Sequence, residues 1–395
     1  MALDIAAVQA ALRADGFDGW LLYDFHGSNP IATRLAGLAG NSGRHMATRR
    51  WYYLIPAQGA PRGLVHAIER HNLDDLPGAK DVYAGREQLA AGLRRLTAGL
   101  HRVAMEYSPG GAIPYVSRVD GGTIEAVRTL GVEIVSSGDL VQRFEAVWDA
   151  AALASHRAAA ERVYRVKDRA FETIAERLQH GRTVTEYDIQ QLMVGWFEDE
   201  GLVSDSAPNV SAQANAGNPH YLPGPQGSRT IGRNELVLLD LWGKLRTPGA
   251  VYADITWVAF TGATPPADQQ RAFGAVCEAR DAALDLIQQA ARAGRELQGW
   301  EADRAAWTVL ERAGYADHVL HRTGHSLGTD VHGNGANLDD YETHDDRRLL
   351  PGTGFTIEPG VYFDTFGVRT EINVVMGERD ATVTGPMQTA LVALD

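Results

Sequence analysis

The stretch ELVLLDLWGKLRTPGAVYADITWVAF, residues 235–260, contains two β-branched and apolar runs separated by turn-forming residues. This pattern predicts an antiparallel hairpin. Opposed residues in such a hairpin share one midpoint, and Asp240 and Asp254 centre on Thr247 in the turn. We therefore expect the two aspartates to lie roughly opposite each other on one face. The apolar residues around them indicate burial, where an unpaired carboxylate is costly.

A second stretch, FTIEPGVYFDTFGVRTEINVV at residues 355–375, repeats this arrangement. Here Glu358 and Glu371 centre on the turn at residues 364–366. Like charges opposite each other on neighbouring strands are destabilising, by roughly 0.2–1 kcal/mol on exposed surfaces. A single acidic residue in a strand is usually just solvated. Two opposed carboxylate pairs in apolar strands instead indicate a bound cation.

The fifth candidate ligand lies between these hairpins, in HRTGHSLGTDVHGNG at residues 321–335. His325 is flanked there by Gly324 and Gly328, which let a ligand approach the backbone closely. Four carboxylates and one imidazole, without a thiolate, suit Mn²⁺, Co²⁺, Fe²⁺ or Zn²⁺. Two ions about 3.5–4 Å apart would use the whole set.

The full length of 395 residues favours two domains over a single core. We expect an α/β domain at 1–148, because helix-like and strand-like segments alternate there, and a second domain at 149–395. Predicted helices of the first domain lie at 4–14 and 86–99, and predicted strands at 20–23, 51–56, 63–68 and 102–108. Predicted helices of the second domain lie at 150–178, 186–200, 266–293 and 299–313.

The net charge of −13 opposes binding to nucleic acid or to anionic membranes. Cys277 is the single cysteine, so no intrachain disulfide can form. The first residues read as an amphipathic helix rather than a signal peptide, and no run reaches the ~18 apolar residues of a membrane span. These features predict a cytoplasmic protein with neither a nucleic-acid nor a membrane partner.

The five candidate ligands occur in the motifs DLWG, ADIT, TGHSLG, TIEPG and RTEI, in that order. This order resembles the creatinase and methionine-aminopeptidase superfamily, the pita-bread metallopeptidases. It is most similar to the branch of Xaa-Pro dipeptidases (prolidases) and Xaa-Pro aminopeptidases. The resemblance implies an α/β chain in which a creatinase-type N-terminal domain precedes a pita-bread α+β catalytic domain.

The resemblance also implies a role for each ligand. Asp240 would bind one ion, Asp254 and Glu371 would bridge two divalent ions, and His325 with Glu358 would complete the second. Glu358 would in addition act as general base for a metal-bridging hydroxide that attacks the scissile carbonyl. Manganese is the expected metal, with zinc, cobalt or iron as alternatives.

Three further residues match positions of the family. His220 in GNPHYLP would contact the scissile amide or shuttle a proton, and His332 in DVHGNG would hydrogen-bond the substrate carbonyl. Both are therefore expected to bind substrate and act in catalysis, although the bland alternatives are a turn histidine and a structural one. Arg369, two residues before Glu371 on the same strand face, would orient that carboxylate without binding metal, and a surface arginine without a role is the alternative.

The chain also departs from the family pattern. Asp240 and Asp254 are 14 residues apart, a longer spacing than usual, and Ser326 replaces a common glycine. Gly333 and Asn334 follow His332 where many relatives have an acidic residue. The arginine that clamps a dipeptide carboxylate in prolidases would align near His344, with Arg347 and Arg348 close by. These differences bear on substrate length rather than on the metal chemistry.

The resemblance predicts hydrolysis of the bond between a first residue and a following proline, with Xaa-Pro dipeptides as the expected substrates. An Xaa-Pro aminopeptidase acting on longer peptides is the alternative. Metal-free creatinase-type hydrolysis and a non-catalytic binding module would both predict missing ligands, and none is missing. Four aromatic residues are candidates for a proline pocket or for the core: Tyr221, Trp242, Trp257 and Tyr362. By analogy with the family, a homodimer is expected.

Overall fold

The computed structural model describes residues 3–38 and 47–395. The chain divides into two units, Met1–Glu145 and Ala146–Asp395. The domain boundary expected between residues 148 and 149 stays a prediction, because a spatial division of the chain does not measure independent folding.

The first unit is built on a six-stranded sheet of order β4-β3-β2-β1-β5-β6. Its strands are β1 (Gly19–Asp24), β2 (Trp51–Pro56), β3 (Arg62–His66), β4 (Ala79–Tyr83), β5 (Arg102–Met105) and β6 (Glu133–Ser136). Its helices are α1 (Ile5–Ala14), α2 (Pro30–Leu35), α3 (Arg86–Leu96), α4 (Gly121–Arg128) and α5 (Gly138–Val141).

The central strand β1 is buried on both faces. Trp20 and Leu22 pack with residues of α1 and α2, whereas Leu21 and Tyr23 pack with residues of α3 and α4. Helices therefore cover both faces of the sheet, and this explains why β1 is apolar throughout rather than alternating. The predicted α/β texture of this part of the chain is confirmed.

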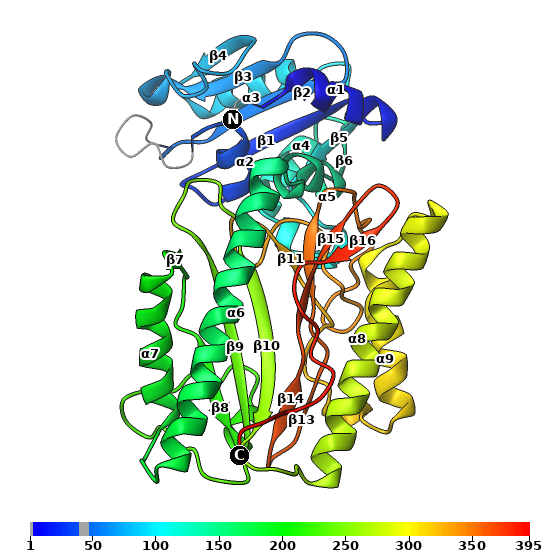
Figure 1. Ribbon diagram of the computed structural model, residues 1–395. Coiled ribbons are helices and arrows are strands. Elements are labelled where there is room, and N and C mark those ends of the chain that lie inside the picture. The colour runs from blue at the N-terminus through cyan, green and yellow to red at the C-terminus, as the bar shows by residue number, and fades with distance from the viewer. Residues whose placement is uncertain (1–2, 39–46) are drawn as a thin grey trace. The chain divides into compact units, whose positions relative to one another are not determined.

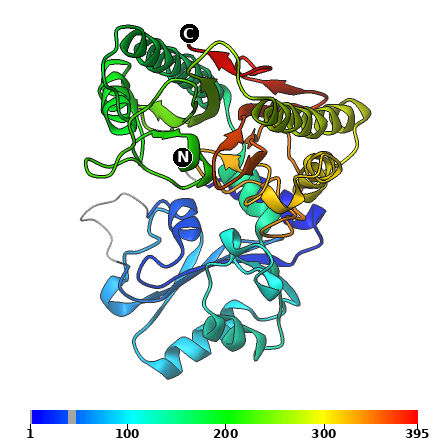
Figure 2. The same ribbon diagram turned by 90° about the horizontal axis from the view of Figure 1, so that it is seen from below.

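The second unit contains two helix pairs that flank its strands (Figure 1). The helices are α6 (Ala150–Gln179), α7 (Glu186–Asp199), α8 (Ala267–Ala293) and α9 (Gly299–Arg312), all close to the predicted spans. Asp149 caps the first turn of α6, and Thr185 with Asp188 forms a capping box at α7. In the view from below, the strands of this unit lie between the two helix pairs (Figure 2).

One sheet of the second unit has the order β17-β10-β9-β7, and β8 also pairs with β9. Its strands are β7 (Leu202–Val203), β8 (Asn209–Ala212), β9 (Leu236–Leu245), β10 (Ala253–Phe260) and β17 (Val392–Ala393). The predicted hairpin forms, but its register differs by two residues from the expected one. Asp240 lies opposite Thr256, and Asp254 lies opposite Trp242. The two aspartates thus share a face diagonally, because the turn centres one position later than Thr247.

The other strands form a sheet of order β11-β12-β15-β16 and a two-stranded ribbon, β13-β14. Their bounds are β11 (Ser326–Leu327), β12 (Gly354–Ile357), β13 (Gly360–Tyr362), β14 (Gly367–Arg369), β15 (Ile372–Met376) and β16 (Ala381–Val383). Gly354 pairs with Val375, and Gly360 pairs with Arg369. Both pairs share the midpoint of Glu358 and Glu371, so the second predicted register is correct.

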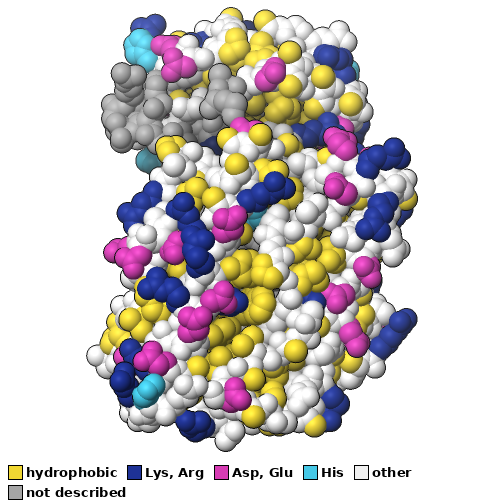
Figure 3. All heavy atoms as spheres, viewed as in Figure 1, with side chains coloured by type: hydrophobic (Ala, Val, Ile, Leu, Met, Phe, Trp, Pro, Cys, Tyr) yellow, Lys and Arg dark blue, Asp and Glu magenta, His cyan; other side chains and the backbone are white. Residues whose placement is uncertain are grey.

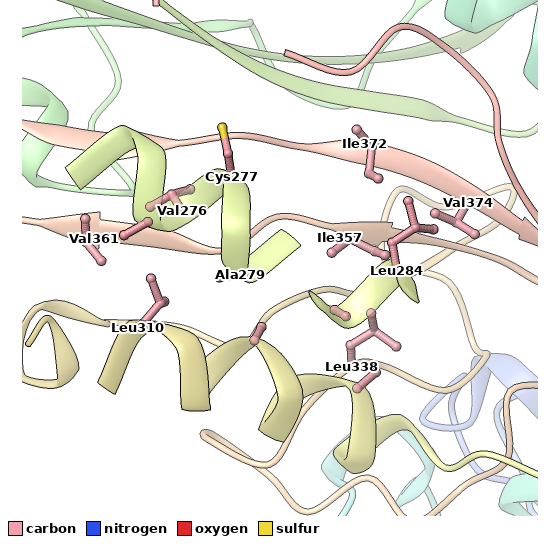
Figure 4. Close-up of a cluster of buried hydrophobic side chains, with 14 of the residues drawn as sticks. Val276, Cys277, Ala279, Leu284, Leu310, Leu338, Ile357, Val361, Ile372 and Val374 are labelled. Carbon is pink, nitrogen blue, oxygen red and sulfur yellow. The ribbon is translucent and has the colours of Figure 1, made fainter. Parts of the chain in front are cut away.

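Helix α8 packs its apolar side onto these strands. Figure 4 shows Leu284 of α8 beside Ile357, and Val276 on the side of Val361, within one layer of hydrophobic side chains. Burial raises the pKa of the Cys277 thiol to about 11. The thiol is thus neutral and serves as a small apolar group.

Positive and negative side chains are interspersed over the face of the molecule shown in Figure 3. Within the described part of the chain, every helix is too short or too polar to cross a membrane.

Candidate metal centre

The structure brings the predicted ligands close together. Ligand atoms of Asp254, His325 and Glu371 all lie within 4.8 Å of one another. His325 Nε2 lies 3.5 Å from Asp254 Oδ2 and 3.3 Å from Glu358 Oε1. Asp240 joins the group through Arg369, which binds its carboxylate. Residues separated by more than 100 positions in the sequence thus form one cluster.

Two carboxylate oxygens of this cluster are unsatisfied. Asp254 Oδ1 and Glu371 Oε1 are buried and have no hydrogen-bond partner among the described residues. Burial, together with the neighbouring carboxylates, raises the pKa of Asp254 and of Glu371 well above the usual range. Burial also raises the pKa of Asp240 to about 7. Carboxylates arranged in this way are stabilised by a cation.

The imidazole supplies the remaining kind of ligand. Burial lowers the pKa of His325, so its ring is neutral and Nε2 can donate a lone pair to a metal. Oxygen ligands and one nitrogen, with no thiolate, fit a hard or borderline divalent ion. The residues present therefore fit a divalent metal ion.

Two threonines orient the acidic ligands. Thr256 Oγ1 donates to Glu371 Oε2 over 2.9 Å, and Thr356 Oγ1 donates to Glu358 Oε1 over 3.1 Å. Thr356 Oγ1 also accepts a hydrogen bond from the backbone N–H of His325 at 3.0 Å. Sequence reasoning missed both threonines. The available signal was their spacing, since each lies two residues from an acidic ligand and therefore on its side of the strand.

Arg369 contacts the centre differently from the prediction. Its guanidinium binds Asp240, donates to Thr256 Oγ1 at 2.9 Å, and lies 3.9 Å from Glu358 Oε2. It reaches Glu371 only through Thr256. The predicted orientation of Glu371 is thus indirect, and the direct partners of Arg369 are the two carboxylates expected to bind different ions.

Tyr362 and His321 hold the Arg369 side chain in place through a chain of hydrogen bonds. Arg369 Nη1 donates to the Tyr362 hydroxyl at 3.2 Å, and that hydroxyl lies 2.6 Å from His321 Nε2. His321 Nδ1 lies 2.7 Å from the Arg322 carbonyl, so Nδ1 carries the proton and Nε2 accepts from the tyrosine. Tyr362, a candidate for a proline pocket, is buried and supports the arginine instead.

The other three aromatic candidates also have structural partners. Tyr221 donates from its hydroxyl to Glu186, and Trp242 donates from Nε1 to Asp205. The ring of Trp257 packs against the core beside α6 and lies 3.9 Å from the Lys167 ammonium. Of these three, Trp257 packs against a hydrophobic cluster, whereas Tyr221 and Trp242 are half-buried and bond to acidic side chains.

His332 lies beside His325, with ring centroids 4.4 Å apart in an edge-to-face arrangement. The proximity of His325 and burial lower the pKa of His332 to about 4, so the ring is neutral near pH 7. The loop that carries His332 folds tightly onto Ser326. A Cβ on Gly333 would meet Ser326 Oγ at 2.9 Å, and Gly335 N donates to that oxygen at 3.0 Å. The serine that departs from the family pattern therefore holds this loop.

His220 is exposed, and its ring makes no hydrogen bond to the metal-ligand candidates within the described part of the chain. Its loop is anchored instead by Glu186, a fully buried carboxylate at the start of α7. Glu186 accepts hydrogen bonds from four groups of this segment: Ala212 N (2.7 Å), Asn215 Nδ2 (3.0 Å), Tyr221 OH (2.6 Å) and Arg229 N (2.9 Å). Sequence reasoning did not identify this role of Glu186.

The three cationic candidates for a carboxylate clamp all have acidic partners. His344 Nδ1 lies 2.6 Å from Asp340 Oδ1, and Arg348 Nη1 lies 3.1 Å from Glu296 Oε1. Arg347 is buried, pairs with Asp345 at 2.6 Å, and donates to the Asn334 carbonyl at 3.1 Å. Arg347 thus stabilises the His332 loop from its far side.

Comparison with known proteins agrees with this geometry. Residues 154–378, more than half of the chain, match metallopeptidase family M24. The chain belongs to this family. The M24 chain is 28% identical over 255 residues to the "Probable dipeptidase PepE" of Mycobacterium tuberculosis, a match that covers 64% of this chain and 62% of that relative. It is 35% identical over 163 residues to the "Xaa-Pro dipeptidase" of Lactobacillus helveticus, covering 41% of this chain and 40% of the relative.

Two solved structures confirm the fold over nearly the whole M24 chain. Dipeptidase PepE from Mycobacterium ulcerans has a TM-score of 0.72 at 23% identity, covering 99% of this chain and 96% of that one. The prolidase from Pyrococcus horikoshii OT3 has a TM-score of 0.62 at 18% identity, covering 98% and 99%. The predicted architecture, an N-terminal α/β domain followed by a pita-bread catalytic domain, is confirmed.

Proposed function

We propose that this M24 chain hydrolyses the peptide bond between a first residue and a following proline, with Xaa-Pro dipeptides as its substrates. The observation that carries the proposal is the cluster of Asp254, His325 and Glu371, in which two buried carboxylate oxygens have no partner. The names of the curated relatives, dipeptidase and Xaa-Pro dipeptidase, support the substrate class.

The five ligands would hold two divalent ions. Asp240 would hold one ion, His325 and Glu358 would hold the other, and Asp254 and Glu371 would serve both. When bound, such ions polarise a carbonyl and lower the pKa of a coordinated water to about 7. The absence of thiolate ligands favours manganese, with zinc, cobalt or iron as alternatives.

Glu358 is the proposed general base. Burial raises the pKa of Glu358, whereas the neighbouring side chains of His325, Arg369 and His321 lower it, and the pKa lies below the usual value. The carboxylate is therefore ionised at neutral pH and ready to accept a proton from the attacking water. The Thr356 hydroxyl fixes one of its oxygens.

Two histidines are proposed to act on the substrate. His332 has a neutral ring beside His325, where it can donate a hydrogen bond to the substrate carbonyl. His220 is carried on the loop that Glu186 anchors, and it would contact the scissile amide. Arg369 would position Asp240 and Glu358 relative to each other.

The alternative activity is that of an Xaa-Pro aminopeptidase acting on longer peptides. The acidic partners of His344, Arg347 and Arg348 favour it, because a dipeptide carboxylate would have to compete with them. The proposed location of the protein is the cytoplasm, which its single, buried cysteine supports. The homodimer rests on the family resemblance alone.

The decisive experiment compares hydrolysis of Ala-Pro and Ala-Pro-Ala by metal-stripped protein, before and after addition of Mn²⁺, Co²⁺ or Zn²⁺. We expect metal to restore cleavage of Ala-Pro, and Glu358→Gln to abolish that activity while the fold is retained. Cleavage of the tripeptide would assign the aminopeptidase activity instead. Absence of cleavage of both peptides with every metal would overturn the proposal.

A further inference from the structure

Strand β8 borders the metal centre along one side of β9. Asn209 lies directly opposite Asp240 in this antiparallel pair, and Ser211 lies opposite Leu238. Side chains that lie opposite each other project from the same face of a sheet. Asn209 and Ser211 therefore project from the face that carries Asp240.

The alternating residues of β8 confirm this orientation. Val210 and Ala212 pack in the hydrophobic cluster that contains residues of α6 and α7. Leu238, on the Asp240 face, belongs to the other cluster, which contains residues of β12 and β15. The sheet thus places two polar side chains of β8 on the inner face, next to the proposed ligands.

Both side chains are buried and have an unsatisfied oxygen. Asn209 is 3% exposed and Ser211 is 1% exposed. Neither Asn209 Oδ1 nor Ser211 Oγ has a hydrogen-bond partner among the described residues. Each such oxygen costs roughly 1–3 kcal/mol when it stays unpaired. By contrast, Thr256 on the same face both donates to Glu371 and accepts from Arg369.

The chemistry of an Xaa-Pro substrate limits what could pair with these oxygens. The proline nitrogen has no hydrogen, its ring is a hydrocarbon, and a terminal carboxylate only accepts hydrogen bonds. Hydrogen-bond donors therefore occur only on the first residue, as the α-ammonium group or the side chain. A side-chain hydroxyl can donate to Asn209 Oδ1 and also accept from Ser211 Oγ. A neutral hydroxyl satisfies both groups without adding a further charge to this buried layer.

We propose that Asn209 and Ser211 form a recognition site for the side chain that precedes proline, and that they select a hydroxyl-bearing residue such as threonine. The inference rests on the proposed function and names the kind of Xaa-Pro dipeptide that the enzyme would prefer. Asn209 and Ser211 then determine specificity, and the metal ligands do the chemistry.

Thr-Pro and Val-Pro test this proposal, because threonine and valine have nearly the same shape and differ by a hydroxyl. For the metal-loaded full chain we expect kcat/KM for Thr-Pro to exceed that for Val-Pro by at least about tenfold. Asn209→Leu, which keeps the side-chain size, should reverse the preference, and Ser211→Ala should reduce it. Dissociation constants of the two dipeptides on the Glu358→Gln variant should show the same order by calorimetry.

The matched control is Val210→Ala, whose side chain lies on the opposite face of β8 and whose ratio should equal that of the wild type. Equal kcat/KM values for the two dipeptides in the wild type would overturn the proposal. An equal loss of kcat/KM on both dipeptides in Asn209→Leu would also overturn it, and would show that Asn209 binds the α-ammonium group.

If circular dichroism shows that Asn209→Leu does not fold, Asn209→Ala and Ser211→Ala make the same comparison. Failure to cleave Ala-Pro would mark failure of the proposed function itself, whereas cleavage of Ala-Pro with a Thr/Val ratio of one would mark failure of this inference alone.

Discussion

The Thr256 hydroxyl donates to Glu371 Oε2 over 2.9 Å, although the two residues are 115 positions apart in the sequence. The same hydroxyl accepts a hydrogen bond from Arg369 Nε, also at 2.9 Å. Thr256 therefore links the carboxylate proposed to contact both ions with the guanidinium that binds Asp240. Its own position is fixed because it lies opposite Asp240 in the β9–β10 pair.

Replacement of Thr256 by valine should weaken metal binding without unfolding the protein. Valine keeps the shape but leaves Glu371 without its donor, and outer partners of this kind typically contribute about 10–100-fold in affinity. Titration of the metal-free protein with Mn²⁺ by calorimetry measures the effect. Thr173→Val is the control, because the Thr173 hydroxyl only donates to a carbonyl within its own helix. Unchanged affinity in Thr256→Val would show that Glu371 does not need this donor.

Glu186→Gln should lower activity through His220. The amide cannot accept all the hydrogen bonds that the Glu186 carboxylate receives, so the loop bearing His220 loses its anchor. We expect kcat/KM on Ala-Pro to fall roughly 10–100-fold, as for lost hydrogen bonds to a charged group. In a double-mutant cycle, Glu186→Gln should cost little more once His220 is already alanine. Glu198→Gln, at an exposed position of α7, is the control, and additive losses would contradict the idea.

Arg347→Met should destabilise the protein rather than change its choice of substrate length. Removal of the guanidinium leaves Asp345 buried and unpaired, which costs about 3–5 kcal/mol. Urea unfolding measures this loss, and the neighbouring Arg348→Met should show little of it because its partner Glu296 is exposed. A stable Arg347→Met variant that loses activity on Ala-Pro alone would instead identify Arg347 as the carboxylate clamp.

Glu106 should make the stability of the N-terminal unit depend on pH. Burial raises the pKa of this carboxyl to about 7, although Trp20, Asn29 and Ser137 donate hydrogen bonds to it. The folded state then keeps a proton that the unfolded state loses above its ordinary pKa of 4.5. The contribution to stability is complete below pH 4.5, and up to roughly 3 kcal/mol is lost by pH 7.

The difference in unfolding free energy between the wild type and Glu106→Gln, measured by urea titration at several pH values, isolates this effect. The wild type should lose stability relative to Glu106→Gln as the pH rises from 4.5 to 7. A difference that stays constant across this range, or that changes in the opposite direction, would contradict the assignment.

The sequence predicted the elements well because their signals are local. The helices of the second unit follow their predicted spans within a few residues, and the Glu358–Glu371 register is correct because its turn is short. The Asp240–Asp254 register was wrong by two residues. The longer 246–252 segment leaves the turn centre undetermined, and alternation along the strands cannot distinguish registers that differ by two.

The ligands were predictable from the order of motifs, but their supporting groups were not. Thr356 lies only two residues from its partner Glu358, so its spacing was the one local signal of such a pair. Thr256 and Glu186 act on residues brought close only by folding, and no local pattern encodes these pairs. The role of Arg347 was open for the same reason, because its acidic partner and the Asn334 carbonyl meet it through the loop conformation. The unsatisfied oxygen of Asn209 likewise becomes visible only when the pairing of β8 with β9 is known.

The proposed ligands come from strands and loops that the ribosome synthesises far apart in time. Asp240 and Asp254 emerge early, whereas His325, Glu358 and Glu371 follow much later. At about 5–20 residues per second, the interval between Asp240 and Glu371 lasts on the order of ten seconds. Metal acquisition is therefore expected to be a late event of biosynthesis, and a nascent chain that stalls before Glu371 would hold aspartates but no complete centre.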